Sequence, residues 1–359
     1  MPKRSAILAT AVGAIVFATL PALSAERFRP PGEILREPAN TLVVATAAEM
    51  VGQARIRFEV VEVLSDERAG ELTEVSRDQQ ATPVEPSPGV EHADQSWNVR
   101  MSPKTASEVR LGSTYIIGIS RYLRGRFPLP RWRLDPEGFR LVALPVVGEA
   151  ILGPSPDLRF LLTVPANASG RASRQTLDHI LRLLRGPPTA ARRVAVLELF
   201  FHPQLGALLA PGEINHLRAM IENETEETAV RDYLLQAAAL FPAAAGPDWV
   251  AGSCRTVLRR APRQVQLGSA VASFQHTVLR ILKERGDSGD LDLAAGMLHS
   301  VSPGVTLSAL QTMEALDPKG AVEKARAALS VAGLPEQSRR YIEDFLKRTE
   351  NNSDQNHKG

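Results

Sequence analysis

The chain has 359 residues, of which 44% are hydrophobic, 23% charged and only 5% aromatic, a composition typical of a globular protein with room for about two domains. Its 42 basic and 40 acidic residues nearly cancel, and the balance becomes 40 against 40 once Lys3 and Arg4 are set aside. Proteins that bind nucleic acid through bulk charge carry a basic excess, so we expect no nucleic-acid partner.

The first 25 residues have the three parts of a secretory signal peptide. Lys3 and Arg4 form a basic start, residues 5–20 an apolar stretch, and the sequence PALSA a small-residue exit. We therefore expect cleavage after Ala25 and a periplasmic or secreted protein that keeps no membrane span. The alternative is an uncleaved anchor, for which the apolar stretch is shorter than the ~20 residues that a spanning helix needs.

Cys254 is the only cysteine, so the exported chain would form no internal disulfide and its cores would be stabilised by burial alone. In the segment DWVAGSCRTVLRR a helix places Cys254 on one face with Val250, Val257 and Leu258. This pattern favours a small buried side chain over the alternative of a reactive thiol.

Residues 40–165 show the period of two that is typical of β-strands. In ARIRFEVVEVL, for example, Ile56, Phe58 and Val60 alternate with more outward-facing positions. Strand signals occur at 41–47, 54–64, 96–101 and 113–120, and further apolar stretches at 140–147 and 158–164. The polar residues 79–94 contain three prolines and are predicted to form a long mobile loop. Five or more short strands predict a small antiparallel barrel or sandwich.

Three segments in this region, TLVVATAAEMVG, RIRFEVVEVLSDE and VRLGSTYIIGISRYL, resemble in their order the netrin-like, or tissue-inhibitor-of-metalloproteinase-like, barrel of the oligonucleotide/oligosaccharide-binding (OB) class. The matching residues are Phe58, Val60, Val63, Leu64, Gly112 and Tyr115. Protease inhibitors of that family present an N-terminal cysteine to the zinc of the enzyme. The mature start expected near Glu26 has no cysteine, so the resemblance implies the barrel and not the inhibitory mechanism.

Residues 166–174 are small and polar and are predicted to be a linker, after which 175–347 form a train of amphipathic helices. In the first helix, Leu177, Ile180 and Leu181 begin a single apolar stripe. The helices are expected at 175–185, 189–201, 212–223, 227–241, 247–260, 266–284, 290–299, 305–316, 321–332 and 336–347. Helices this short are marginal alone and must bury their stripes against neighbours.

These helices come in pairs that recur about every 30–45 residues, which is the range of helical solenoids. The segments ETEETAVRDYLLQAAALF and SPGVTLSALQTMEAL resemble the second helix of HEAT-type repeats, with Arg231 at the position of that family's frequent arginine. A non-repetitive helical bundle is the alternative. Residues 348–359 are predicted to be a disordered tail. The predicted fold class is thus α+β, a small antiparallel OB/netrin-like barrel followed by a HEAT-like α-solenoid.

The chain lacks the usual signatures of catalysis and metal binding. It has no H-E-x-x-H, G-x-S-x-G or P-loop sequence, so we expect no cofactor, no metal and no catalytic residue. Asp178 and His179 point to different faces of a helix and are taken as a surface pair. Asp287, Asp290 and Asp292 in GDSGDLDLAAG leave a calcium site as an alternative to acids at a helix start.

One basic and aromatic segment, RYLRGRFPLPRWR at 121–133, has no acidic residue. Its predicted partner-binding residues are Arg121, Tyr122, Arg124, Arg126, Arg131, Trp132 and Arg133. Guanidinium groups bind carboxylates or phosphates and aromatic rings add stacking area, so the segment predicts an anionic partner. The alternative is a solvated hairpin that serves solubility.

We therefore expect an exported, non-enzymatic scaffold that uses a helical-repeat surface and the basic–aromatic segment to bind a protein or an anionic envelope component. The alternative is an envelope enzyme or enzyme inhibitor with a site at the domain junction, which should show a deep pocket with converging polar groups.

Overall fold

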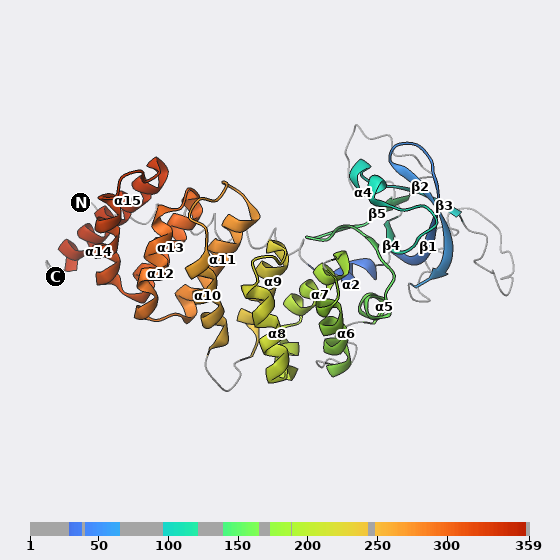
Figure 1. The fold of residues 1–359 in the computed structure, drawn as a ribbon, viewed down its shortest axis with the longest axis horizontal. Coiled ribbons are helices and arrows are strands. Elements are labelled where there is room, and N and C mark those ends of the chain that lie inside the picture. Colours follow the sequence, from blue (N-terminus) through green and yellow to red (C-terminus); the bar gives the residue numbers. More distant parts are fainter. Residues whose placement is uncertain are drawn as a thin grey trace, which may run out of the picture. The chain divides into compact units, whose positions relative to one another are not determined.

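The computed structural model describes residues 29–37, 40–64, 96–120, 139–164, 173–187, 189–242 and 248–356. The chain forms two compact units, one ending at Phe201 and the other beginning at His202 (Figure 1). The first contains a β-barrel and the second is helical, which confirms the predicted α+β architecture. The expected signal peptide, the loop at 79–94 and most of the linker at 166–174 lie outside the described residues.

Five strands form the barrel: β1 (Asn40–Met50), β2 (Arg55–Val63), β3 (Ser96–Arg100), β4 (Thr114–Ser120) and β5 (Phe139–Leu141). Hydrogen-bonded neighbours follow the order β1-β2-β3-β5-β4, and β4 also pairs with β1, which closes the sheet. These pairs are antiparallel except for β3 and β5, which run parallel. Three short strands follow: β6 (Ala143–Leu144), β7 (Gly148–Glu149) and β8 (Ile151–Leu152).

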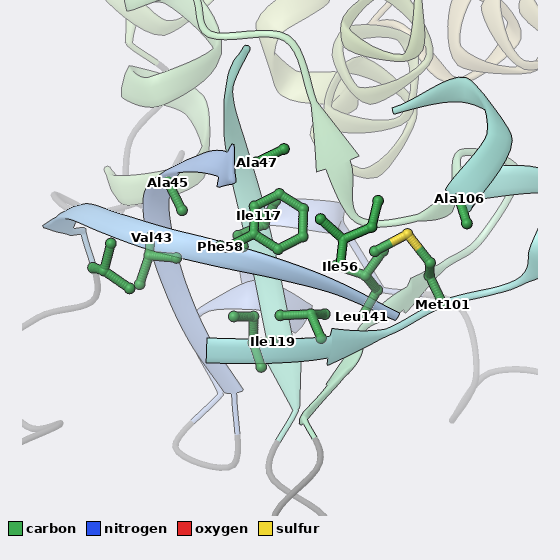
Figure 2. Packing of buried hydrophobic residues seen from close by; sticks show 12 residues of the cluster. Val43, Ala45, Ala47, Ile56, Phe58, Met101, Ala106, Ile117, Ile119 and Leu141 are labelled. Atoms are coloured by element: carbon green, nitrogen blue, oxygen red, sulfur yellow. The ribbon is translucent and has the colours of Figure 1, made fainter. Parts of the chain in front are cut away.

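Alternate residues of the strands fill the barrel interior. On β2, Ile56, Phe58 and Val60 are buried, and the charged residues between them are exposed. Figure 2 shows the Phe58 ring beside Ile56 and Ile117 in the centre of this core. A short helix, α4 (Pro103–Glu108), adds a buried alanine to the same cluster. The alternation that the sequence predicts for this strand is confirmed.

The apolar stretch 158–164, which the sequence groups with the strand signals, is instead part of a helix, α5 (Pro156–Thr163). The hydroxyl of Ser155 accepts a hydrogen bond from the Leu158 N–H, and Pro156 occupies the first helical turn. Three leucines at helical spacing are buried: Leu158, Leu161 and Leu162. The strand interpretation was wrong because a short apolar run fits both periods, and the capping sequence decides between them.

A five-residue helix, α2 (Pro31–Leu35), joins the barrel to two helices of the same unit. The N–H of Gly32 donates to Oε1 of Glu198 at 2.8 Å, and Nη1 of Arg36 donates to the Leu162 carbonyl at 3.1 Å. Leu35 packs so closely on β4 that a Cβ at Gly118 would lie 2.2 Å from its Cδ2. α2 therefore has partners on both sides, in the barrel and in the helices.

Two helices that the sequence pattern groups with the solenoid, α6 (Arg174–Arg185) and α7 (Ala190–Phe201), belong to the first unit in the structure. Both pack on α5, and α7 also contacts α2. The two predicted helices are confirmed, but the boundary between the two compact units falls after Phe201. Whether residues 40–165 fold independently stays a prediction.

The second unit is built from helical pairs. Its longer helices are α8 (Pro211–Glu222), α9 (Thr228–Leu240), α10 (Trp249–Arg260), α11 (Ala270–Arg285), α13 (Pro303–Leu316), α14 (Pro318–Leu329) and α15 (Glu336–Asn356). Its shorter ones are η2 (Pro203–Leu208), η3 (Ser288–Asp290), α12 (Leu291–Gly296) and η4 (Met297–His299). Among the described residues no helix is both long enough and apolar enough to cross a bilayer.

The last helix runs further than the sequence predicts. Residues 348–356 continue α15, where a disordered tail is expected from 348 onwards. Two ion pairs hold this extension to preceding helices, Arg348 with Glu314 at 2.8 Å and Glu350 with Arg326 at 3.0 Å. These partners lie 24 and 34 residues away in the sequence, so local polarity gives no sign of them.

The helices of this unit lie in two rows. α9, α11, α13 and α15 touch one another in succession, and α8, α10, α12 and α14 form a second succession. Buried hydroxyl groups link the first row: Thr312 Oγ1 donates to the Leu279 carbonyl at 3.0 Å, and Thr306 and Ser338 share a hydrogen bond of 2.9 Å. Small polar side chains that find carbonyl or hydroxyl partners allow close helix packing without unsatisfied groups.

Removing the Glu198 carboxylate should unfold the first unit more easily, because the Gly32 N–H and the Arg36 guanidinium would lose a buried acceptor and a counter-charge. We expect Glu198→Ala to lower the free energy of unfolding by about 3 kcal/mol. Glu198→Gln should cost less, since its amide oxygen can still accept from Gly32. Urea unfolding followed by tryptophan fluorescence in a Trp249→Phe background reports this unit; Glu59→Ala, at an exposed position, is the control. Equal effects of Glu198→Ala and Glu59→Ala would contradict this role.

Cys254 should resist thiol reagents while the chain is folded. Its side chain is fully buried, and burial raises the pKa of the thiol to about 12, to which the charge of Asp248 adds. At pH 8 the reaction with a disulfide reagent should be on the order of 1,000-fold slower than in the urea-unfolded chain. The folded chain has very little thiolate at this pH, and the reagent cannot reach the buried sulfur. Fast labelling of the folded chain would restore the reactive-thiol interpretation.

Candidate functional site

Three arginines lie side by side on the barrel. Arg55 of β2 is the register partner of Arg100 of β3, and Arg100 is the partner of Arg140 of β5. Partners on neighbouring strands point to the same face, and the strands are about 4.8 Å apart. The three side chains therefore form a continuous line of positive charge, which we call the arginine row.

The alternation of the strands directs the arginine row outwards. Ile56 and Val99, next to Arg55 and Arg100 in the sequence, are both fully buried, so the arginines belong to the opposite face. Arg100 is exposed, and the two flanking arginines are half-buried. Like charges directly opposite each other destabilise a sheet, a cost that the further interactions of Arg55 and Arg140 within the molecule can offset. A row of this kind fits a surface that meets negative charge.

The arginine row borders the connection between β4 and β5. Arg140 is the register partner of Ser120, the last residue of β4, so residues 121–138 begin and end at this position. That connection contains every predicted partner-binding residue: Arg121, Tyr122, Arg124, Arg126, Arg131, Trp132 and Arg133. They lie outside the described residues, and their role stays a prediction. The described residues on either side of the segment, Ser120 and Phe139, lie next to Arg140.

Arg55, Arg100 and Arg140 are absent from the sequence-based prediction because each stands alone in its own strand. The period of two indicates that each faces outwards, but it does not tell which strands are neighbours or in which register they pair. The order β2-β3-β5 arises from barrel closure, a long-range property. The one available signal was an arginine at an outward position in each of three strands.

A second polar cluster crosses the first row of the helical unit. Nδ1 of His276 on α11 is hydrogen-bonded to Oγ of Ser308 on α13. On α9, Asp232 accepts a hydrogen bond from Nε2 of Gln236 at 3.1 Å. Burial raises the pKa of Asp232, a shift opposed by hydrogen bonds from Thr277 and Gln236 and by nearby positive charge. The cluster therefore joins three successive helices.

This cluster is built into the packing between helices. The Ser308 hydroxyl has two partners, the Gly304 carbonyl at 2.9 Å and Nδ1 of His276, so it is also tied to the backbone of its own helix. Ser308 is also buried, with 4% of its surface exposed. The pair is suited to holding α13 on α11.

Asp178 and His179 have different partners, as their places on the helix predict. Asp178 forms an ion pair with Arg174 at 2.8 Å, and His179 Nδ1 lies 2.6 Å from Oδ1 of Asp157 on α5. Burial raises the pKa of Asp157, but hydrogen bonds from Arg182 and His179 outweigh it and hold the pKa below its usual value. These contacts fasten α6 to α5 within the first unit.

The acids considered for calcium already have cationic partners. Arg255 donates to both oxygens of Asp290, at 2.6 and 2.9 Å, and its Nη2 also reaches Asp287 at 3.0 Å. Asp292 pairs with Lys324 at 2.6 Å. Within the described ranges no group of three or more histidine, cysteine or acidic side chains is placed to hold a metal ion. The arrangement is that of an ion-pair network at a helix start.

Comparison with known proteins gives no relative: no protein family, no curated protein sequence and no solved structure matches the chain.

The Arg255–Asp290 pair should make the helical unit sensitive to acid. Burial raises the pKa of Asp290, but hydrogen bonds from Arg255 and the Asp287 backbone outweigh it and keep the pKa below its usual value. A carboxyl with a lowered pKa stabilises the fold above its unfolded pKa and loses that contribution as pH falls through the folded pKa. We expect Asp290→Asn to cost about 2 kcal/mol at pH 7.

The difference in stability between the parent chain and the Asp290→Asn variant should shrink once the pH falls below about 4. Urea unfolding of the helical unit, followed by circular dichroism at both pH values, measures it. Asp292→Asn is the matched control, because Asp292 and its partner Lys324 are largely exposed and such pairs contribute little. A loss of the same size at pH 7 and pH 3 would show that the charge of Asp290 is irrelevant.

Proposed function

We propose that the protein is an exported, non-enzymatic binding protein, in which the barrel binds an anionic partner and the helical unit serves as a scaffold for a protein. The observation that carries this proposal is the arginine row, at the point where the basic–aromatic connection begins and ends. Export rests on the signal-like residues 1–25.

The order of the barrel strands supports the OB class for the first unit. Barrels of this class have five strands in a Greek-key arrangement, and they bind ligands on the face of strands 2 and 3 and on the loops after strands 1 and 4. Here the arginine row crosses β2, β3 and β5, and the connection after β4 contains the basic–aromatic segment. The netrin-like identity within this class is part of the proposal.

The charge chemistry favours multivalent anions. A guanidinium fork binds carboxylate, phosphate or sulfate oxygens with two parallel hydrogen bonds. A single exposed pair is worth only about 0.2–1 kcal/mol, so useful affinity needs several arginines acting together. The arginine row supplies three arginines, and the connection that joins β4 to β5 supplies five more in its sequence.

The helical unit supports the scaffold part of the proposal. Its two successions of helices form a stack in which each pair touches the next. Stacks of this kind present extended surfaces that suit protein or peptide partners. Arg231, the residue of the HEAT resemblance, donates to the Ile221 carbonyl at 2.9 Å and lies over the Phe274 ring. It thus links α8, α9 and α11, as expected of a residue that repeats use for stacking.

Neutralising the arginine row should weaken binding to a polyanion. We expect Arg55→Gln, Arg100→Gln and Arg140→Gln together to lower affinity for dextran sulfate by about tenfold or more, since three charge contacts are lost. Arg124, Arg126, Arg131 and Arg133 changed to Ala should act in the same direction and reduce capture of the partner from the native envelope. Both effects should be larger at low salt.

The matched control changes three exposed basic residues of the same unit: Arg57→Gln, Lys104→Gln and Arg159→Gln. Uncharged dextran controls for the polymer, and thermal unfolding verifies the fold of each variant. Equal losses in the row variant and the control variant would show that only net charge matters, and the proposed surface would be abandoned.

A further inference from the structure

The helices of the first row run in the same direction. Ser308 of α13 meets His276 of α11, and Thr312, one turn later, meets Leu279. The contacts between α13 and α15 follow the same order along both helices. Thr306 contacts Ser338, and Glu314, further along α13, contacts Arg348, further along α15. The N-terminal ends of α11, α13 and α15 therefore lie along one edge of the unit. So do the connections before them, residues 261–269, 300–302 and 330–335, which we call the three tips.

Each tip carries an exposed aliphatic side chain. Leu267 is 67% exposed, Val301 39% and Val331 46%. Leu267 precedes Gly268, whose φ of +71° turns the chain sharply at this point. The last two tips are neighbours, because the Ser338 hydroxyl donates to the Ser300 carbonyl at 3.0 Å. A single exposed aliphatic residue is ordinary, but one on each of three successive tips gives this edge a repeated apolar character.

Positive charge also gathers at the first tip. Arg263 lies in this tip, and Arg259 and Arg260 directly precede it. All three are exposed, and within the part of the chain that the structure describes none makes a hydrogen bond or ion pair, although Arg259 is near enough to Asp290 to help lower the pKa of that carboxyl. Arg259 and Arg260 close α10, where the helix dipole favours cations, but Arg263 lies beyond the helix end. None of the three tips contains an acidic residue. The edge thus combines exposed aliphatic side chains with arginines.

We propose that the three tips form a docking surface for an anionic lipid bilayer. Leu267, Val301 and Val331 enter the interfacial region, and the three arginines bind headgroup phosphates. Aliphatic insertion together with basic charge is the combination that holds peripheral proteins on anionic membranes. A stable protein partner usually needs a continuous face of about 800 Å² on each side, whereas a bilayer accepts separate points.

The acidic connection before α9 marks the limit of the docking surface. α9 runs parallel to α11, because Arg285 near the end of α11 donates to the Ala239 carbonyl near the end of α9. The connection at 223–227 therefore lies on the same edge, and it carries Glu224, Glu226 and Glu227. These acids are repelled by anionic headgroups, so contact is confined to the three later tips.

A fluorescent label at the first tip tests this proposal directly. Leu267→Cys, in the full chain, is labelled with a polarity-sensitive dye, while Cys254 stays buried. The chain also carries Arg124, Arg126, Arg131 and Arg133 changed to Ala, so the basic–aromatic segment does not contribute. Vesicles of phosphatidylglycerol and phosphatidylcholine should shift the dye emission to the blue, and pure phosphatidylcholine vesicles should not.

Leu240→Cys is the matched control, because Leu240 is 55% exposed at the opposite, C-terminal end of α9. Its dye should show no shift with the same vesicles. In sedimentation with vesicles, two variant sets should each lower binding by about tenfold or more. One set is Leu267→Gln, Val301→Gln and Val331→Gln; the other is Arg259→Gln, Arg260→Gln and Arg263→Gln. Lys283→Gln, Lys319→Gln and Lys347→Gln, at exposed positions outside the tips, should bind like the parent.

The proposal fails if anionic vesicles leave the Leu267 dye unchanged, or if they shift the dye at position 240 equally. It also fails if soluble polyglutamate shifts the Leu267 dye and vesicles do not, since an acidic protein face is then the partner. Both labelled chains keep Arg259, Arg260 and Arg263. The chain labelled at position 267 keeps two of the three aliphatic residues and the chain labelled at position 240 keeps all three, so a folding defect of the multiple tip variants does not affect this result. Glu224→Gln should strengthen sedimentation with anionic vesicles.

Discussion

The first unit depends on one buried hydrogen bond, from the Gly32 N–H to the Glu198 carboxylate. Glu198 is 2% exposed, and a carboxylate removed from water is tolerated only with hydrogen bonds and positive charge around it. The N-terminal turn of α2 supplies the hydrogen bond and Arg36 supplies the charge. With α2 fixed there, Leu35 can fill the space beside Gly118 of β4. Barrel, α2 and α7 therefore stabilise one another.

The second unit is held together in another way. Its neighbouring helices meet through leucines and alanines, and also through threonine and serine hydroxyls such as those of Thr306, Thr312 and Ser338. Each hydroxyl bonds to a group on a neighbouring helix of the row, so α11, α13 and α15 pack side by side in the same direction. This parallel packing aligns the tips on one edge. The proposed membrane contact thus follows from packing inside the unit, while the proposed anion-binding surface follows from strand register in the barrel.

Local pattern accounts for most of the helices and the longer strands. The periods of 3.6 and two predict α10 and β2 well, because each buries one face and exposes the other. They fail for α5, where eight residues are too few to show a helical period and the capping sequence carries the information. They also say nothing about the arginine row, because three single arginines become neighbours only through strand order. Of the candidate surfaces, the basic–aromatic segment is visible in the sequence, and the other two are created by the fold.

The distance along the chain between partners differs greatly between the units. Gly32 and Glu198 are 166 residues apart, whereas Thr306 and Ser338 are separated by 32. As the chain emerges from the ribosome, the helical unit can add one pair at a time to a growing stack. The first unit has to wait for its last helix before α2 gains its buried partner, so its N-terminal segment stays exposed for most of its synthesis. For the export proposed above, such late completion would keep the N-terminal part of the nascent chain in the unfolded, threadable state that passage through a translocation channel requires.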